Sequence, residues 1–157
     1  MPLMSPDNEH CAVLVPDRQI ATMDLRKPNS FKMWPSQQGM ISALAYSPDG
    51  RFLASAAEDG TIAIWDVSTR CHVLTLSTKQ FPLPTMERMR GGSLDIPHSI
   101  AFSPDGTRLL VGCSGGQGLF LWKLPSGEPD RPFQWPAGEK HYGFTFVAIS
   151  PSGQTCL

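Results

Sequence analysis

Long apolar runs and clusters of like charge are both missing from this sequence of 157 residues. No apolar stretch approaches the roughly 20 residues that a transmembrane helix needs, so a membrane is not an expected partner. The chain has 13 Lys and Arg residues against 14 acidic ones, without a long run of either sign. Because phosphate binding depends on clustered Lys and Arg, nucleic acid is not an expected partner either.

Cysteine pairs and catalytic motifs are missing as well. The four cysteines lie far apart without a CxxC pair, which argues against a metal site or a disulfide framework and favours a reducing compartment. The four histidines are scattered, and no nucleophile motif or glycine-rich phosphate loop is present. The first ten residues lack the basic and apolar regions of a secretory signal, so we expect the cytoplasm or the nucleus. The sequence therefore predicts no catalytic residue, no cofactor and no metal site.

What the sequence does contain is a repeat. Residues 5–25 (SPDNEHCAVLVPDRQIATMDL) align without a gap with residues 47–67 (SPDGRFLASAAEDGTIAIWDV), and 8 of the 21 positions are identical. A third copy begins at Ser103 and a fourth at Ser150. A spacing of 42 residues between the first two copies lies in the range typical of repeat architectures.

Each copy has the pattern of four antiparallel strands. In Ser-Pro-Asp-Gly, proline presets φ at the first central position and glycine accepts positive φ at the end, which predicts a tight turn between two strands. The segment EDG at 58–60 predicts a second turn, and CHVLTL at 71–76 predicts the outermost strand. Both alternating faces of ISALAY and FLASAA are apolar or small, so we expect sheets that are covered on both sides. Four-stranded sheets repeated around an axis form a β-propeller.

These residues resemble the WD-repeat propeller family over nearly the whole chain. The unit at 41–76 is the best copy, because it carries Ser47-Pro48-Asp49-Gly50, Asp59-Gly60 and a closing Trp65-Asp66. The resemblance implies structural roles for Ser55, Asp59, Trp65, Asp66 and Trp122. In the family a histidine joins the turn Asp, a Ser or Thr and the Trp in a hydrogen-bonded network. None of the corresponding positions, Ser36-Gln37, Gly92-Ser93 and Glu139-Lys140, holds that histidine, so we expect a partial network in the middle unit and none in the third.

The expected fold is therefore an all-β, antiparallel WD-repeat propeller segment of about three blades with open ends. We expect a partial blade at about 5–35 that begins at its second strand, and a blade at about 41–76. An insertion loop at about 77–97, a blade at about 98–135 and a partial blade at about 144–157 follow. The smallest propellers have about four blades, so the remaining blades would come from sequence outside this chain.

The insertion is the main departure from the repeat. The third copy follows the second by 56 residues, 14 more than the first spacing, and the extra residues fall mainly at 77–97. Its apolar and basic residues suit contact with a peptide or protein. A surface insertion without function fits the same composition, because loops accept added residues freely. The residues that we predict to bind a partner are Phe81, Met86, Arg88, Arg90, Glu58 and His98.

The function expected from these features is a non-catalytic scaffold or adaptor that presents a rigid rim to a protein or peptide. Packed blades hold loop residues in place, which lowers the ordering entropy that binding would otherwise cost. The alternative is a segment of a propeller-based enzyme or of its regulatory domain. An enzyme would need convergent polar residues on the first strands, where the sequence offers only Ser42, His98 and Ser99.

Overall fold

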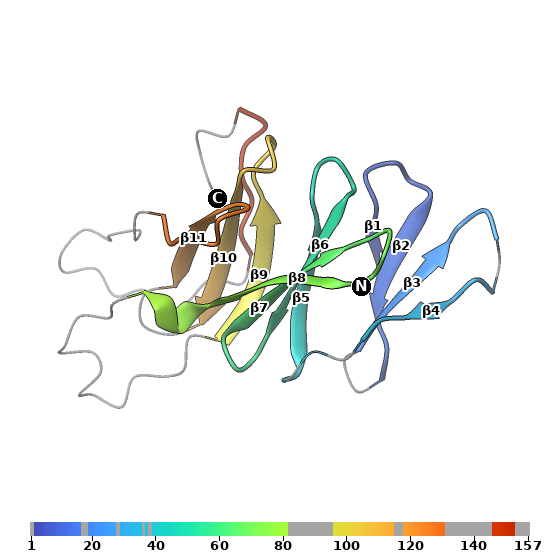
Figure 1. The fold of residues 1–157 in the computed structure, drawn as a ribbon, viewed down its shortest axis with the longest axis horizontal. Coiled ribbons are helices and arrows are strands. Elements are labelled where there is room, and N and C mark those ends of the chain that lie inside the picture. Colours follow the sequence, from blue (N-terminus) through green and yellow to red (C-terminus); the bar gives the residue numbers. More distant parts are fainter. Residues whose placement is uncertain are drawn as a thin grey trace.

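The structure is a computed structural model, and it consists of short antiparallel strands arranged in three sheets (Figure 1). It describes residues 2–16, 19–27, 29–35, 37, 39–81, 96–114, 118–130 and 146–152. The first sheet contains β1 (Leu3–Met4), β2 (His10–Leu14), β3 (Ile20–Asp24) and β4 (Lys32–Met33). The second contains β5 (Ile41–Tyr46), β6 (Phe52–Ala57), β7 (Thr61–Asp66) and β8 (His72–Ser77), and a short 3₁₀ helix, η2 (Thr78–Gln80), follows it. The third contains β9 (Ile96–Phe102), β10 (Arg108–Ser114) and β11 (Leu119–Lys123).

The repeated Ser-Pro-Asp turns join the first and second strands of each sheet. Ser47 accepts a hydrogen bond from the Gly50 amide at its carbonyl (2.9 Å), and its side-chain oxygen accepts one from the Phe52 amide (2.8 Å). Gly50 has φ of +70°, a conformation that glycine adopts without steric penalty. In the first sheet this position is Asn8, with φ of 57°, because asparagine tolerates the left-handed region better than most residues.

The first sheet differs from the sequence-based expectation at its start. We expected this unit to begin at its second strand, whereas Leu3–Met4 pairs with β2 as a short first strand, in the register Leu3↔Ala12 and Met4↔Cys11. The turn at Ser5 stabilises the pairing, since the Ser5 amide donates to the His10 carbonyl (2.9 Å). The first sheet therefore has four strands, and it begins before residue 5.

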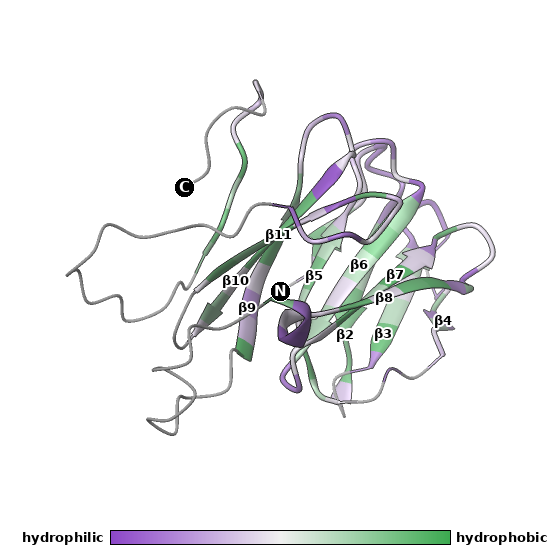
Figure 2. Ribbon diagram, turned by 60° about the vertical axis from the view of Figure 1, so that its left-hand side comes forward, coloured by the Kyte–Doolittle hydropathy of each residue, from purple (hydrophilic) through white to green (hydrophobic). Residues whose placement is uncertain are grey.

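The sheets pack face to face in chain order, so both faces of the second sheet are buried. On one side, Leu53, Ala63 and Trp65 pack with Ile20 and other residues of the first sheet. The opposite side packs against the third sheet. This larger core contains Ala54, Ala56, Ile62, Ile64, Phe120 and Trp122. Figure 2 shows the same pattern, with apolar strands at the centre and polar turns at their ends. Ala54, Ala56 and Ala57 of β6 are 0% exposed, as expected for a strand that is covered on both faces.

The third sheet is followed by the beginning of another repeat. Its described part has three strands, and Trp122 forms an isolated bridge with Pro129 beyond β11. The Val147 amide donates to the Ser99 side chain (2.9 Å), and Val147 packs on Leu110 and Leu119. The outer face of the third sheet is thus partly covered by residues 146–149. Within the described residues, no helix is long and apolar enough to cross a membrane.

Candidate functional site

One edge of the second and third sheets carries the described residues that the sequence singled out for partner binding. The turn Glu58–Gly60 joins β6 to β7 at this edge, and the Thr78 amide donates to the Gly60 carbonyl (3.0 Å). His98 lies near the start of β9, where its Nε2 is 2.9 Å from the Ser114 side-chain oxygen. We call this edge, defined by Glu58–Gly60, Thr78–Phe81 and Ile96–His98, the hairpin rim.

A chain of hydrogen bonds runs from the core of the second sheet to the hairpin rim. Trp65 Nε1 donates to the oxygen of the fully buried Ser55 side chain (2.8 Å), and that hydroxyl donates to Gln37 Oε1. Gln37 Nε2 donates to the Thr61 hydroxyl (3.3 Å), which in turn donates to the Asp59 carboxylate (2.6 Å). The expected partial network is in fact continuous in this sheet, because an amide can both accept and donate where histidine was expected.

The third sheet satisfies its tryptophan in another way. Trp122 Nε1 donates to Gln80 Oε1 (3.2 Å), although we expected no network here. By strand register, Val111 lies where the second sheet has Ser55, so no hydroxyl stands between the indole and the amide. Gln80 belongs to η2 and also accepts a hydrogen bond from the Ser77 amide, which holds the rim segment in place.

Phe81 corrects the sequence-based interpretation most clearly. We predicted an exposed side chain that contacts a partner, but Phe81 is only 2% exposed and its ring packs edge-on against Phe120 and Trp122, with centroids 5.0 Å apart in both cases. Burial of a large aromatic ring stabilises the fold strongly, and Phe81 belongs to the core between the second and third sheets. Met86, Arg88 and Arg90 lie outside the described residues.

Glu58 and His98, two of the residues predicted to bind a partner, lie at the same edge of the second and third sheets. Glu58 is half-buried, and its amide donates to the Met40 carbonyl (2.9 Å), whereas His98 is exposed. Phe81 and Ile96, the two described residues of the insertion that border positions 82–95, also lie at this edge. The rim therefore combines a fixed turn, an exposed imidazole and the described residues of the insertion on either side of 82–95.

Asp66 has a local role at the opposite edge. Its carboxylate accepts hydrogen bonds from the side chains and amides of Ser68 and Thr69, and the Ser68 hydroxyl makes the largest contribution to lowering its pKa to about 2. Arg51 Nε lies 3.7 Å from the other carboxylate oxygen. Asp66 thus stabilises the turn between β7 and β8.

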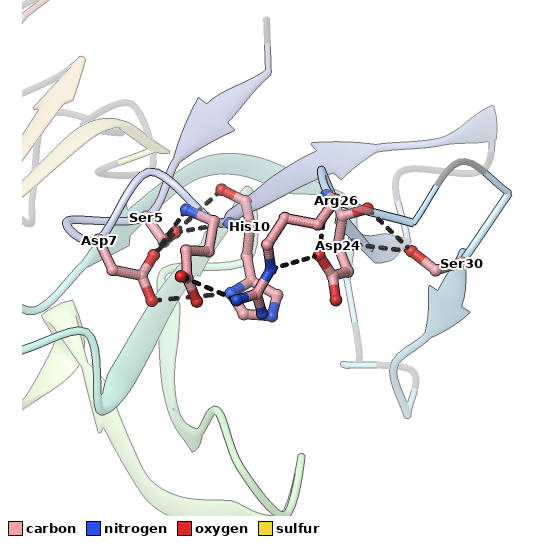
Figure 3. A network of polar contacts seen from close by, with 7 residues as sticks. Ser5, Asp7, His10, Asp24, Arg26 and Ser30 are labelled. Atoms are coloured by element: carbon pink, nitrogen blue, oxygen red, sulfur yellow. Dashed lines mark hydrogen bonds and ion pairs between the residues drawn. The ribbon is translucent and has the colours of Figure 1, made fainter.

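A group of potential metal ligands lies in the first sheet, where the sequence predicted none. Asp7, Glu9 and His10 each place one ligand atom within 4.8 Å of the others. These groups already have partners. Arg26 Nη1 binds Glu9 Oε1 at 2.9 Å, and the Glu9 amide donates to the Asp7 carboxylate. Asp7 also accepts a hydrogen bond from the Ser5 hydroxyl (Figure 3). The guanidinium neutralises one carboxylate, which makes this group a poor ligand set for a cation.

The sequence matches a known repeat family in two places. The family model described as "WD domain, G-beta repeat" matches residues 29–66 and 89–123. WD repeat-containing protein 36 of Homo sapiens is 27% identical over 76% of this chain and 12% of its own length. THO complex subunit 6 of Homo sapiens is 27% identical over 97% of this chain and 42% of its own length. The chain therefore spans less than half the length of these relatives.

The fold also matches a solved structure. Hydrazine synthase of Kuenenia stuttgartiensis superposes with a TM-score of 0.76 over 99% of this chain and 40% of its own chain, at 22% identity. A likeness at that identity concerns the fold alone, which is a set of open antiparallel sheets in propeller arrangement.

Proposed function

Because this chain belongs to the WD-repeat β-propeller family, we propose that it is a non-catalytic scaffold that presents the hairpin rim to a protein or peptide partner in the cytoplasm or nucleus. The observation that carries the proposal is the hydrogen-bonded chain from buried Trp65 to Asp59. It holds the rim turn before any partner arrives, so that binding orders few groups. The relative named as a subunit of the THO complex works in an assembly, which is consistent with this role.

We also propose that the three sheets belong to a longer propeller. By strand register, one face of the first sheet carries Met4, Cys11, Met23 and Met33, and Met4 and Met33 are about half exposed. An apolar sheet face of this kind is normally covered by another layer. Native mass spectrometry of the chain alone tests this, since a stable, folded monomer with no tendency to associate contradicts it.

Site-specific photo-crosslinking in cells tests the scaffold proposal directly. A photoreactive residue replaces Glu58 or His98 in the full-length protein, and as a control it replaces Val73, which is 53% exposed on the outer strand β8. We expect discrete protein adducts from the two rim positions and few from Val73. Equal adduct yields at all three positions would contradict the proposed rim.

Arg88 and Arg90 of the insertion remain part of the proposal. Replacing both, as Arg88→Glu with Arg90→Glu, should lower the adduct yield from Glu58 and leave the circular dichroism spectrum unchanged. An unaltered yield would exclude the insertion from the partner interface while leaving the rim itself in place.

A further inference from the structure

A cleft of about 380 Å³ lies between the first and second sheets, at the edge opposite the hairpin rim. The two Ser-Pro-Asp turns meet beside it, since a Cβ added at Gly50 would lie 3.7 Å from Pro6 Cδ. A volume of this size falls within the range of small-ligand pockets. The lining residues that matter for its chemistry are Asp7, His10, Lys32, Tyr46, Arg51 and Arg70.

The charged groups of the cleft leave a positive excess. Lys32 and Arg70 come from different sheets, and neither forms an ion pair or a side-chain hydrogen bond with any residue that the structure describes. Arg51 is 68% exposed and only loosely paired with Asp66. Asp7 is the single carboxylate of the lining, and it accepts hydrogen bonds from Ser5 and from the backbone.

The acidic residues beside the cleft on the first sheet do not offset this excess. Arg26 binds Glu9 through Nη1 (2.9 Å) and lies 3.4 Å from Asp24 Oδ1 through Nε, so one guanidinium serves two carboxylates (Figure 3). Asp24 also accepts a hydrogen bond from the Arg26 amide (2.9 Å). Lys32 and Arg70 are therefore the cations that remain available to a ligand at the cleft.

Tyr46 supplies a buried polar atom without a partner. The residue is 9% exposed, and its hydroxyl is the one buried side-chain polar atom of the described residues that has no hydrogen bond. Burial, and to a smaller extent the nearby Cys11 and Asp7, raises the pKa of Tyr46 to about 12. The hydroxyl therefore keeps its proton at neutral pH and can donate. Buried polar groups are usually satisfied, so the orphaned hydroxyl of a residue that lines the cleft together with Lys32 and Arg70 points to a missing acceptor.

We propose that this cleft binds an acidic side chain of a partner protein, with the carboxylate held between Lys32 and Arg70 and accepting a hydrogen bond from the Tyr46 hydroxyl. Lys32 and Arg70 line one small cleft from two different sheets, which fits a single carboxylate better than the extended row of phosphates of a nucleic acid. Asp7 in the wall would repel the denser charge of a phosphate dianion. The inference rests on the proposed scaffold function, and it names the chemistry of a second contact on the opposite edge.

Fluorescence anisotropy with a labelled Gly-Glu-Glu-Glu-Gly peptide tests the cleft, with Gly-Gln-Gln-Gln-Gly as the uncharged reference. We expect the glutamate peptide to bind the full-length protein about tenfold more tightly than the glutamine peptide. Lys32→Glu with Arg70→Glu should abolish this difference. The matched control, Lys27→Glu with Lys123→Glu, makes the same change in net charge at exposed positions outside both the cleft and the hairpin rim, and it should leave the affinity within about twofold.

Tyr46→Phe removes only the orphaned hydroxyl, and it should weaken glutamate-peptide binding severalfold without lowering the thermal midpoint. Any of four results would overturn the inference. The first two are equal binding of the two peptides and equal losses in the cleft and control variants. The other two are unchanged binding by Tyr46→Phe and stronger displacement of the peptide by inorganic phosphate than by acetate. Crosslinks from Glu58 that persist alongside such a failure would leave the scaffold proposal standing. Glutamate-peptide binding at the cleft without crosslinks from the rim would support the cleft and contradict the proposed rim.

Discussion

Replacing Phe81 with alanine separates the buried position that the structure shows from the exposed one that the sequence suggested. The ring is 2% exposed and lies 5.0 Å from both Phe120 and Trp122, centroid to centroid. Truncating a buried phenylalanine typically lowers the free energy of unfolding by about 3–5 kcal/mol, because transfer free energy is lost and a cavity remains. The two edge-to-face ring contacts favour the upper part of that range.

The assay is urea denaturation followed by tryptophan fluorescence, with thermal unfolding in parallel. At about 2–4 °C per kcal/mol for a chain of this size, the thermal midpoint should fall by roughly 6–20 °C. Phe31→Ala is the matched control, since Phe31 is 59% exposed and its truncation should change stability by less than about 0.5 kcal/mol. A loss below 1 kcal/mol for Phe81→Ala, or equal losses for the two variants, would refute the burial argument.

Four further substitutions test the turns and the buried network. Ser55→Ala leaves Trp65 Nε1 without its acceptor and should lower the free energy of unfolding by about 1–3 kcal/mol, measured in urea. Gly127→Ala should destabilise more than Gly50→Ala: both have φ near +70°, where a side chain costs roughly 1–2 kcal/mol, but only at Gly127 would the Cβ lie 3.0 Å from a leucine methyl. The Ser103 hydroxyl and then the Thr107 amide lower the pKa of Asp105 to about 2, so its contribution is present above pH 4 and lost as the pH falls towards 2. Asp105→Asn should flatten that part of the stability–pH curve, and an unchanged slope would count against it.

Much of the architecture could be predicted from the repeat because turn chemistry and strand alternation are local properties. Ser-Pro-Asp followed by Gly or Asn marks the first turn of all three sheets, and the apolar composition of both faces of β6 indicates a sheet buried on two sides. The strand Leu3–Met4 escaped prediction because two residues carry no periodicity. Its pairing depends on the neighbouring strand β2 and on the Ser5 turn, which are tertiary features.

The site was harder to predict, since its key contacts join residues distant in sequence. Phe81 stands in a proline-rich segment that resembles a surface loop, and nothing local indicates that Phe120 and Trp122 lie beside it. The cleft between the first two sheets was missed for the same reason. Lys32 and Arg70 are 38 positions apart, and only the stacking of two sheets places them in one lining.

Glutamine explains how the second and third sheets keep their tryptophans satisfied without the family's histidine. In the second sheet Ser55 relays the indole hydrogen bond to Gln37, and in the third the apolar Val111 leaves Gln80 to accept it directly. In the third unit, a fixed offset from the Ser-Pro-Asp turn placed the expected hydrogen-bond partner of Trp122 at Gly92-Ser93. The partner is Gln80 instead, because most of the inserted residues follow Gln80 in the sequence. The insertion thus lies between Gln80, which accepts the Trp122 hydrogen bond, and most of β9. Added length at that point leaves the Trp122 hydrogen bond intact, so the rim can vary in sequence while the sheet beneath it stays the same.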